Sequence, residues 1–152
     1  APGSGITANS VVLKASGPDA VNLYDGSLAA RGIGGGLLLT SDIEARDEQA
    51  LLGRAPALLR SEVLLVPHHG SRTSSTQDFV TASRPRWAVY AVGYRNRWNF
   101  PVRRVVERWE QAGARGGRTS DGGAITFELV PGRALAPPFE WRREHLRPWR
   151  DP

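Results

Sequence analysis

Two adjacent histidines, His68 and His69, directly follow the apolar run 63–66 and precede a glycine and a cluster of hydroxyl side chains. The chain contains only one other histidine, His145. Imidazole nitrogens and carboxylates are ligands of Zn²⁺ and Mn²⁺, and Asp42, which follows another apolar run, supplies a carboxylate. The pattern therefore indicates either a site that binds a divalent metal or polarises a phosphate, or a polar turn that happens to contain two imidazoles.

In the metal-site interpretation Asp42, His68 and His69 are the candidate ligands, and the histidine that does not bind metal moves a proton or orients a ligand. Two metal ions in such a site hold the attacking and leaving oxygens of a phosphodiester. The candidates for phosphate contacts are Ser71, Arg72, Thr73, Ser74, Arg95, Asn96 and Arg97. The alternative for these residues is structural, because serines cap helices and 95–97 form a loop before a predicted helix.

Short apolar runs that alternate with segments of helical composition must position these side chains. We predict strands at 10–15, 36–40, 63–66, 87–92 and 124–130, helices at 44–52, 75–83 and 101–112, and a long loop or hairpin at 16–35. The run STQD at 75–78 resembles a capping box. This alternation predicts an α/β fold, in which ligands gather beyond the carboxyl ends of the strands. Because Asp42, the histidine pair and 94–100 each follow a strand, we expect three polar loops to meet at one edge of the sheet.

Composition limits the classes of protein that fit. The chain has 152 residues, enough for one domain with a core. It has no cysteine, which excludes disulfides and thiolate metal sites, and no apolar stretch approaches the roughly 18 residues that cross a bilayer. The net charge is +5 and 19 of the 20 basic residues are arginine, which suits phosphate recognition and equally fits a genome rich in G and C. We expect a domain at 1–131 and a Pro/Trp/Arg-rich tail at 132–152.

Four stretches, "LLLTSDIEARDEQALL", "LLVPHHGSRTSST", "YAVGYRNRW" and "DGGAITFEL", resemble in this order the later half of the metallo-β-lactamase-like domain of ComEC/Rec2 competence proteins. The run "ITANSVVLKAS" is similar to the Asn-x-Ser strand that precedes this half, so the resemblance covers 6–129. It implies a partial αββα sandwich from a membrane protein that internalises DNA. It also implies a Zn²⁺- or Mn²⁺-dependent nuclease, a neighbouring membrane channel as partner, and a position on the extracytoplasmic face.

The chain departs from the family pattern at three places. The family's Thr-Gly-Asp has Ser41 in place of glycine before Asp42, and its Gly-His-Pro has Phe100 in place of histidine. The His-x-Asp-x-Asp-His metal motif, which belongs upstream, does not occur in these residues. Zinc sites usually need about three or four protein ligands. We therefore expect this chain alone to bind metal weakly, if at all, and to hydrolyse little or nothing, either as a piece of a longer protein or as a degenerate member of the family.

Three functions remain open at this point. The first is phosphodiester hydrolysis in the intact parent. The second is a non-catalytic DNA-binding or assembly module, in which Arg72, Arg95, Arg97 and the tail provide salt-sensitive affinity for DNA. The third, a metal-dependent hydrolase of small molecules, fits the arginine excess less well. No small-molecule cofactor is expected.

Overall fold

The computed structural model describes residues 11–15, 19–24, 27–32, 35–130 and 133–145. Its strands are β1 (Val11–Ala15), β2 (Asp19–Tyr24), β3 (Ser27–Gly32), β4 (Gly35–Leu39), β5 (Val63–Leu65), β6 (Trp87–Tyr90), β7 (Arg115–Arg118), β8 (Ile125–Leu129) and β9 (Phe139–Glu140). Its α-helices are α1 (Ala45–Arg54), α2 (Gln77–Ser83), α3 (Arg103–Gln111), α4 (Thr119–Gly122) and α5 (Trp141–Glu144). The 3₁₀ turns are η1 (Pro56–Leu58) and η2 (Pro67–Gly70).

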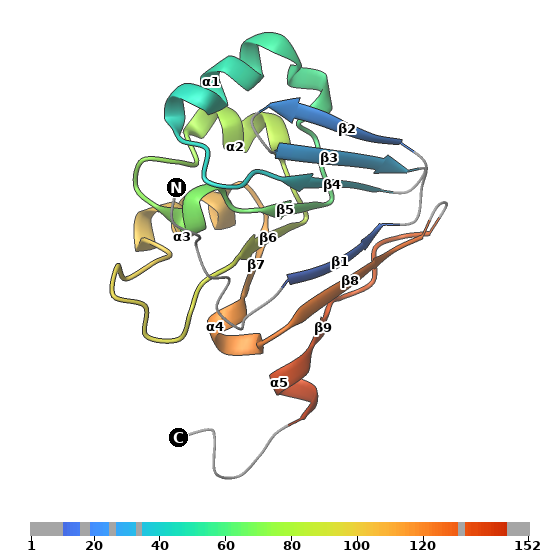
Figure 1. Ribbon diagram of the computed structural model, residues 1–152, viewed down its shortest axis with the longest axis vertical. Coiled ribbons are helices and arrows are strands. Elements are labelled where there is room, and N and C mark those ends of the chain that lie inside the picture. The colour runs from blue at the N-terminus through green and yellow to red at the C-terminus, as the bar shows by residue number, and fades with distance from the viewer. Residues whose placement is uncertain (1–10, 16–18, 25–26, 33–34, 131–132, 146–152) are drawn as a thin grey trace, which may run out of the picture.

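The larger sheet has the strand order β2-β3-β4-β5-β6-β7 (Figure 1). Strands β4 to β7 are parallel, with Leu38 opposite Leu64, Leu64 opposite Ala88 and Ala88 opposite Gly116. Each of these parallel steps contains one helix, α1, α2 or α3, because parallel neighbours need a crossover connection. The predicted α/β fold is confirmed by this sheet, and β2 pairs antiparallel with β3, as the hairpin alternative for 16–35 predicted.

A second sheet of β1, β8 and β9 lies against the larger sheet, on the side away from the helices (Figure 1). In this sheet β1 runs parallel to β8, and β9 pairs antiparallel with β8. Strand β9 comes from the segment predicted as a tail, and Leu135 from the same segment is buried among the residues between the two sheets. Leu135 and β9 therefore join that segment to the two sheets, whereas most of its other described residues are exposed.

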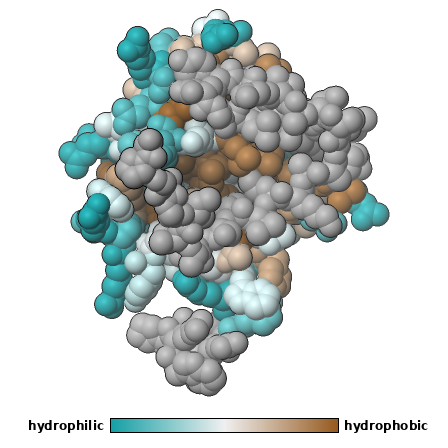
Figure 2. Space-filling model, in the orientation of Figure 1, coloured by the Kyte–Doolittle hydropathy of each residue, from teal (hydrophilic) through white to brown (hydrophobic). Residues whose placement is uncertain are grey.

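The central strands are apolar on both faces, which explains why their sequences are short continuous apolar runs. On the face toward the helices, the strands form one buried cluster with the helix residues Phe79, Val105 and Trp109. The strand residues of this cluster are Leu38, Leu64, Ala88 and Tyr90. Toward the second sheet, a separate buried cluster contains Leu37, Val63, Val89, Ile125 and Phe127. Figure 2 shows apolar residues in the middle of the visible face and hydrophilic ones toward its margins. The two cores fix the strands, and the strands fix the loops at their carboxyl ends.

Candidate functional site

The loops that follow β4, β5 and β6 meet at one edge of the larger sheet. The backbone N–H of His68 donates to Ser41 O at 3.0 Å, and that of Ala45 donates to Thr73 O at 2.9 Å. The N–H of Val102 donates to Gly70 O at 2.9 Å, and α3 begins after this extended N-cap residue, not at the predicted position 101. The expected convergence of the three polar loops is confirmed by these bonds.

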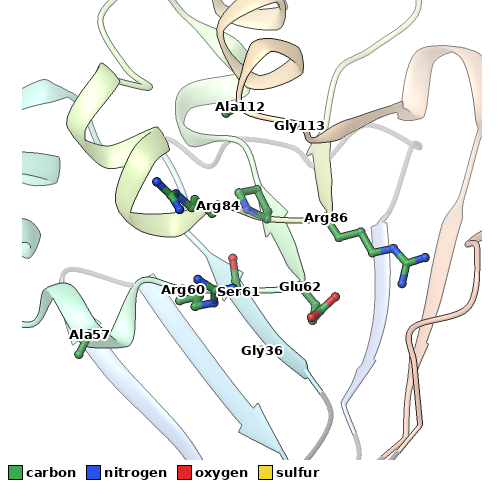
Figure 3. A pocket seen from close by; sticks show the side chains of 10 residues that line it. Gly36, Ala57, Arg60, Ser61, Glu62, Arg84, Arg86, Ala112 and Gly113 are labelled. Carbon is green, nitrogen blue, oxygen red and sulfur yellow. The ribbon is translucent and has the colours of Figure 1, made fainter.

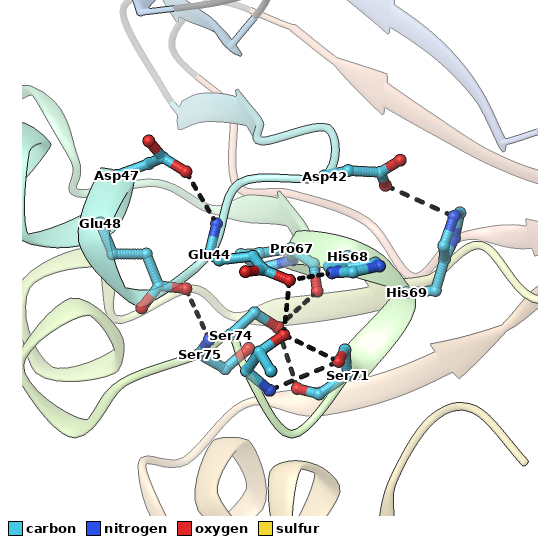
Figure 4. A network of polar contacts seen from close by, with 11 residues as sticks. Asp42, Glu44, Asp47, Glu48, Pro67, His68, His69, Ser71, Ser74 and Ser75 are labelled. Carbon is cyan, nitrogen blue, oxygen red and sulfur yellow. Dashed lines mark hydrogen bonds and ion pairs between the residues drawn. The ribbon is translucent and has the colours of Figure 1, made fainter. Parts of the chain in front are cut away.

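His69 and Asp42 face each other across two of these loops (Figure 4). The His69 Nδ1 atom lies 2.7 Å from the carbonyl oxygen of Ala91, and its Nε2 atom lies 3.4 Å from Asp42 Oδ1. A carbonyl only accepts, so Nδ1 carries the proton that it donates and Nε2 is the nitrogen turned toward the carboxylate. Two acceptors face each other in that tautomer, and a proton or a cation between them is needed for attraction. Both side chains are accessible, with exposed fractions of 47% for His69 and 66% for Asp42.

The distance between these two atoms suits a metal ion. Ligand atoms at about 2.0–2.1 Å from a tetrahedral zinc lie about 3.3–3.4 Å from each other. The 3.4 Å between Asp42 Oδ1 and His69 Nε2 matches two corners of such a site. Within the described residues, however, no group of three or more His, Cys, Asp or Glu side chains is placed to hold a metal ion. The side chains described here therefore fit part of a metal site and not a complete one.

His68 has a different partner from its neighbour. Its Nδ1 atom lies 3.0 Å from Glu44 Oε1, and the same oxygen accepts a hydrogen bond from Thr73 Oγ1 at 2.8 Å (Figure 4). Ser71 Oγ lies 3.0 Å from Thr73 Oγ1 and extends the network. The proton on Nδ1 then points to Glu44, and His68 Nε2 is left as the ring nitrogen for a ligand. Sequence reasoning missed Glu44 because it was assigned to the predicted helix 44–52; its spacing of two from Asp42 is the signal that could have found it.

The histidine turn is held in an uncommon backbone conformation. Three consecutive residues are left-handed, with φ of 46° at His68, 57° at His69 and 83° at Gly70. Side-chain-bearing residues rarely adopt this region, and such outliers cluster at functional sites. Ser41, in the neighbouring loop, is also left-handed, with φ of 50°, a region that glycine adopts more readily than serine. The turn holds both imidazoles at the loop junction at some cost in backbone strain.

Some of the predicted phosphate-contact residues hold loops in place, and others are accessible to a ligand. Ser74 is buried and its hydroxyl lies within hydrogen-bonding distance of Pro67 O and Ser71 O, so it fixes the histidine turn. Asn96 donates to Phe100 O and accepts from Phe100 N, so it fixes its own loop. Three arginines near this edge are exposed: Arg72, Arg95 and Arg97. Thr73 and Ser71 lie beside Glu44, as described above.

Phe100 occupies the position where the family has histidine, beside the imidazole pair. Its ring centroid lies 6.0 Å from that of His68 and 6.5 Å from that of His69, with which it is stacked. A phenyl ring neither binds a metal nor moves a proton. Phe100 therefore packs against the pair and offers it no ligand or proton-transfer group.

A second feature lies at the opposite edge of the sheet (Figure 3). A recess of about 610 Å³ is lined by the segments 60–62, 84–86 and 112–113, which precede β5, β6 and β7. It carries the side chains of Arg60, Arg84 and Arg86, and Arg86 Nη1 donates to Leu135 O at 3.3 Å. Since these segments lie at the amino ends of the strands, the recess is separate from the histidine turn.

No family model matches the chain. The chain is 38% identical over 103 residues to competence protein ComA of Neisseria gonorrhoeae, covering 68% of this chain and 15% of that protein. It is 29% identical over 134 residues to ComE operon protein 3 of Bacillus subtilis, covering 85% and 17%. It is 32% identical over 113 residues to recombination protein 2 of Haemophilus influenzae, covering 74% and 14%. These similarities support a relationship to competence proteins of the ComEC/Rec2 type.

The chain spans 14–17% of the length of these three relatives. Among the described residues, no helix is both long enough and apolar enough to cross a membrane.

Proposed function

We propose that this chain is the later part of a metallo-β-lactamase-like domain in a membrane protein for DNA uptake, and that the intact domain hydrolyses phosphodiesters with a divalent metal. The observation that carries the proposal is the meeting of Asp42 and His69, 3.4 Å apart at the carboxyl edge of a parallel sheet, a distance that fits two ligands of one metal ion and also an ion pair with a protonated imidazole. The relatives named for competence support the role in DNA uptake. The packing of helices, sheet and second sheet supports the fold, since it corresponds to three layers of an αββα sandwich.

In this proposal Asp42 and His69 hold Zn²⁺ or Mn²⁺ together with ligands from other parts of a longer protein. When bound, such an ion polarises a phosphoryl oxygen and lowers the pKa of a bound water. His68 is positioned by Glu44 so that its Nε2 can take up a proton and, once protonated, donate a hydrogen bond to a phosphate oxygen. Arg72 and Thr73 would contact the backbone phosphates around this point, whereas the predicted contact from Ser71 is disfavoured because its side chain is buried against Thr73. The remainder of the parent, including a membrane channel, would place the domain on the extracytoplasmic face.

A second candidate function is a DNA-binding or assembly module without catalysis. The ring of Phe100 beside the histidine pair favours it, because a histidine at that position would complete the chemistry that the family site requires. In this function the exposed arginines give electrostatic affinity for DNA that decreases with salt.

One experiment separates the two functions. Retention of labelled single-stranded DNA by the chain is measured across a salt series, with EDTA or with Mn²⁺. We expect retention that falls with salt, and we expect Mn²⁺ to strengthen it because an ion held by Asp42 and His69 would add positive charge beside a phosphate. His69→Ala and Asp42→Asn should remove the Mn²⁺ effect and any cleavage, and His145→Ala should leave both unchanged. Arg72→Ala should reduce the slope of log affinity against log salt by about 0.7.

The outcomes are distinct. Retention without any effect of Mn²⁺ overturns the metal site and favours the binding module. An Mn²⁺ effect that survives both His69→Ala and Asp42→Asn places the metal somewhere else. A chain that does not retain DNA even at low salt contradicts both the nuclease and the DNA-binding module, and leaves only an assembly role.

A further inference from the structure

Two large aromatic side chains are exposed on the loop that follows β6. The exposed fraction is 61% for Tyr94 and 60% for Trp98. Aromatic rings bury large areas in cores and interfaces, so two exposed rings within five residues point to a binding surface. The loop belongs to the edge that carries the histidine pair.

Each of the two rings carries an arginine. The guanidinium carbon of Arg97 lies 4.2 Å from the Trp98 ring centroid, and that of Arg95 lies 5.2 Å from the Tyr94 ring centroid. Guanidinium planes interact with aromatic faces and also pair with phosphates or stack on nucleobases. Since each guanidinium lies over its ring, a base that binds here stacks on the guanidinium plane or replaces it on the ring, and the released arginine is then placed for a phosphate.

The tryptophan is connected to the candidate metal site through a series of rings. Trp98 is stacked with Phe100 at a centroid distance of 6.4 Å and an interplanar angle of 13°. Phe100 is in turn stacked with His69 at 6.5 Å and 20°. Trp98 is therefore joined to His69 through the single ring of Phe100.

Hydrogen bonds within the loop hold these rings in a defined conformation. Asn96 accepts from Phe100 N at 2.9 Å and donates to Phe100 O at 2.7 Å, and the N–H of Asn99 donates to Asn96 O at 3.2 Å. Such bonds fix the conformation of the loop before a ligand arrives, which lowers the entropic cost of binding. Asn96, predicted as a phosphate contact, is thus the residue that positions Trp98 and Phe100.

We propose that Tyr94 and Trp98 form a stacking surface for the unpaired bases of single-stranded DNA, with Arg95 and Arg97 at its phosphates. The proposal rests on the proposed function for the identity of the polymer, and it adds the strand state and the residues that recognise it. Every base has a π face, so the surface is indifferent to sequence. Bases in a duplex are stacked inside the helix, so only an unpaired base can reach the rings.

The test measures binding of the chain to a labelled oligothymidylate by fluorescence anisotropy, in EDTA at constant salt. Trp98→Ala should weaken binding about 5- to 150-fold, the change that corresponds to about 1–3 kcal/mol of base stacking. Trp98→Phe should recover much of the affinity, because it restores a ring. Trp141→Ala is the matched control: Trp141 is also exposed, at 53%, and is stacked on His145 in the C-terminal segment. It should bind as the unchanged chain does.

A second oligonucleotide isolates stacking from charge. A strand with the same backbone but abasic positions should bind more weakly, and Trp98→Ala should not weaken it further. A duplex of equal length should bind without dependence on Trp98. Equal affinities of the Trp98→Ala and Trp141→Ala chains, an equal loss on the abasic strand, or no binding by the unchanged chain would each overturn the proposal. Because no metal is present, failure here leaves the Mn²⁺ effect above to decide the proposed function.

Discussion

Replacing Glu48 with alanine is expected to lower the free energy of unfolding by about 2–5 kcal/mol, because two backbone N–H groups lose their acceptor. Glu48 is fully buried on α1 and accepts from Ser75 N at 2.5 Å and from Thr76 N at 2.7 Å. Arg108 of α3 donates to Ser75 O, so the same turn joins three helices. Chemical denaturation of the unchanged chain and of the Glu48→Ala variant measures the difference in their free energies of unfolding.

The matched control is Glu107→Ala, which removes the partner of a surface ion pair with Arg103. Such exposed pairs contribute little, so its unfolding free energy should change by less than about 1 kcal/mol. Similar losses in the Glu48 and Glu107 variants would contradict the role assigned to the buried carboxylate.

The same carboxyl gives a pH dependence with a definite sign. Burial raises the pKa of Glu48, and the hydrogen bonds from Thr76 and Ser75 and the charge of Arg108 only partly oppose that rise. A raised folded-state pKa means that the stabilising contribution is complete below the unfolded pKa and is lost as pH rises through the folded pKa. The cost of Glu48→Gln should therefore be greater in acid than at neutral pH.

Gly70→Ala is expected to destabilise the chain by about 2–5 kcal/mol, the sum of a left-handed conformation and an overpacked contact. Gly70 has φ of 83°, and a Cβ atom there would lie 2.6 Å from Pro101 Cβ and 3.2 Å from a ring carbon of Tyr90. The strain would act directly on the turn that carries His68 and His69. Thermal unfolding and denaturant titration both report the change.

Gly53→Ala provides the comparison for this variant. Gly53 lies in α1, and a Cβ atom there would meet no other atom within 4 Å. Alanine favours the helix, so this change should leave stability unchanged or raise it by about 0.5–1 kcal/mol. Equal unfolding free energies for the Gly70→Ala and Gly53→Ala variants would contradict the tight packing of the histidine turn against Pro101.

The parallel sheet and the meeting of three loops at one edge could be predicted from sequence. Strands buried on both faces are continuous apolar runs, as at 36–40 and 63–66, and such runs identify their own carboxyl ends. Because these ends share an edge, the two apolar runs are enough to place Asp42 near the histidine pair.

Other features depend on tertiary contacts that no local pattern encodes. Strand β7 has the sequence RGGR, whose glycines disfavour a strand, and it forms because β6 offers an open edge. The capping box expected at 75–78 is wrong: Thr76 is the N-cap of α2 without a side-chain hydrogen bond. Glu48, 28 residues away, accepts the N–H of Thr76 in its place.

The two histidines face different carboxylates, and this difference depends on the folded turn. Adjacent residues in a sequence cannot show which imidazole faces which carboxylate. The left-handed turn directs His68 to Glu44 and His69 to Asp42, a distinction that depends on backbone angles at three residues. Likewise, no local pattern shows that the ring of Trp98 is mostly exposed.

The proposed pairing of Asp42 and His69 around a metal ion is tested most directly by an NMR titration of the three histidine side chains with Zn²⁺. We expect His69 to carry its proton on Nδ1, its Nε2 signal to shift at the lowest Zn²⁺ concentrations, and Asp42→Asn to weaken that shift while His145→Ala leaves it unchanged. Zn²⁺ that shifts His145 first, or a His69 response that is the same in the Asp42→Asn chain, would contradict the pairing of this imidazole and this carboxylate around a metal ion.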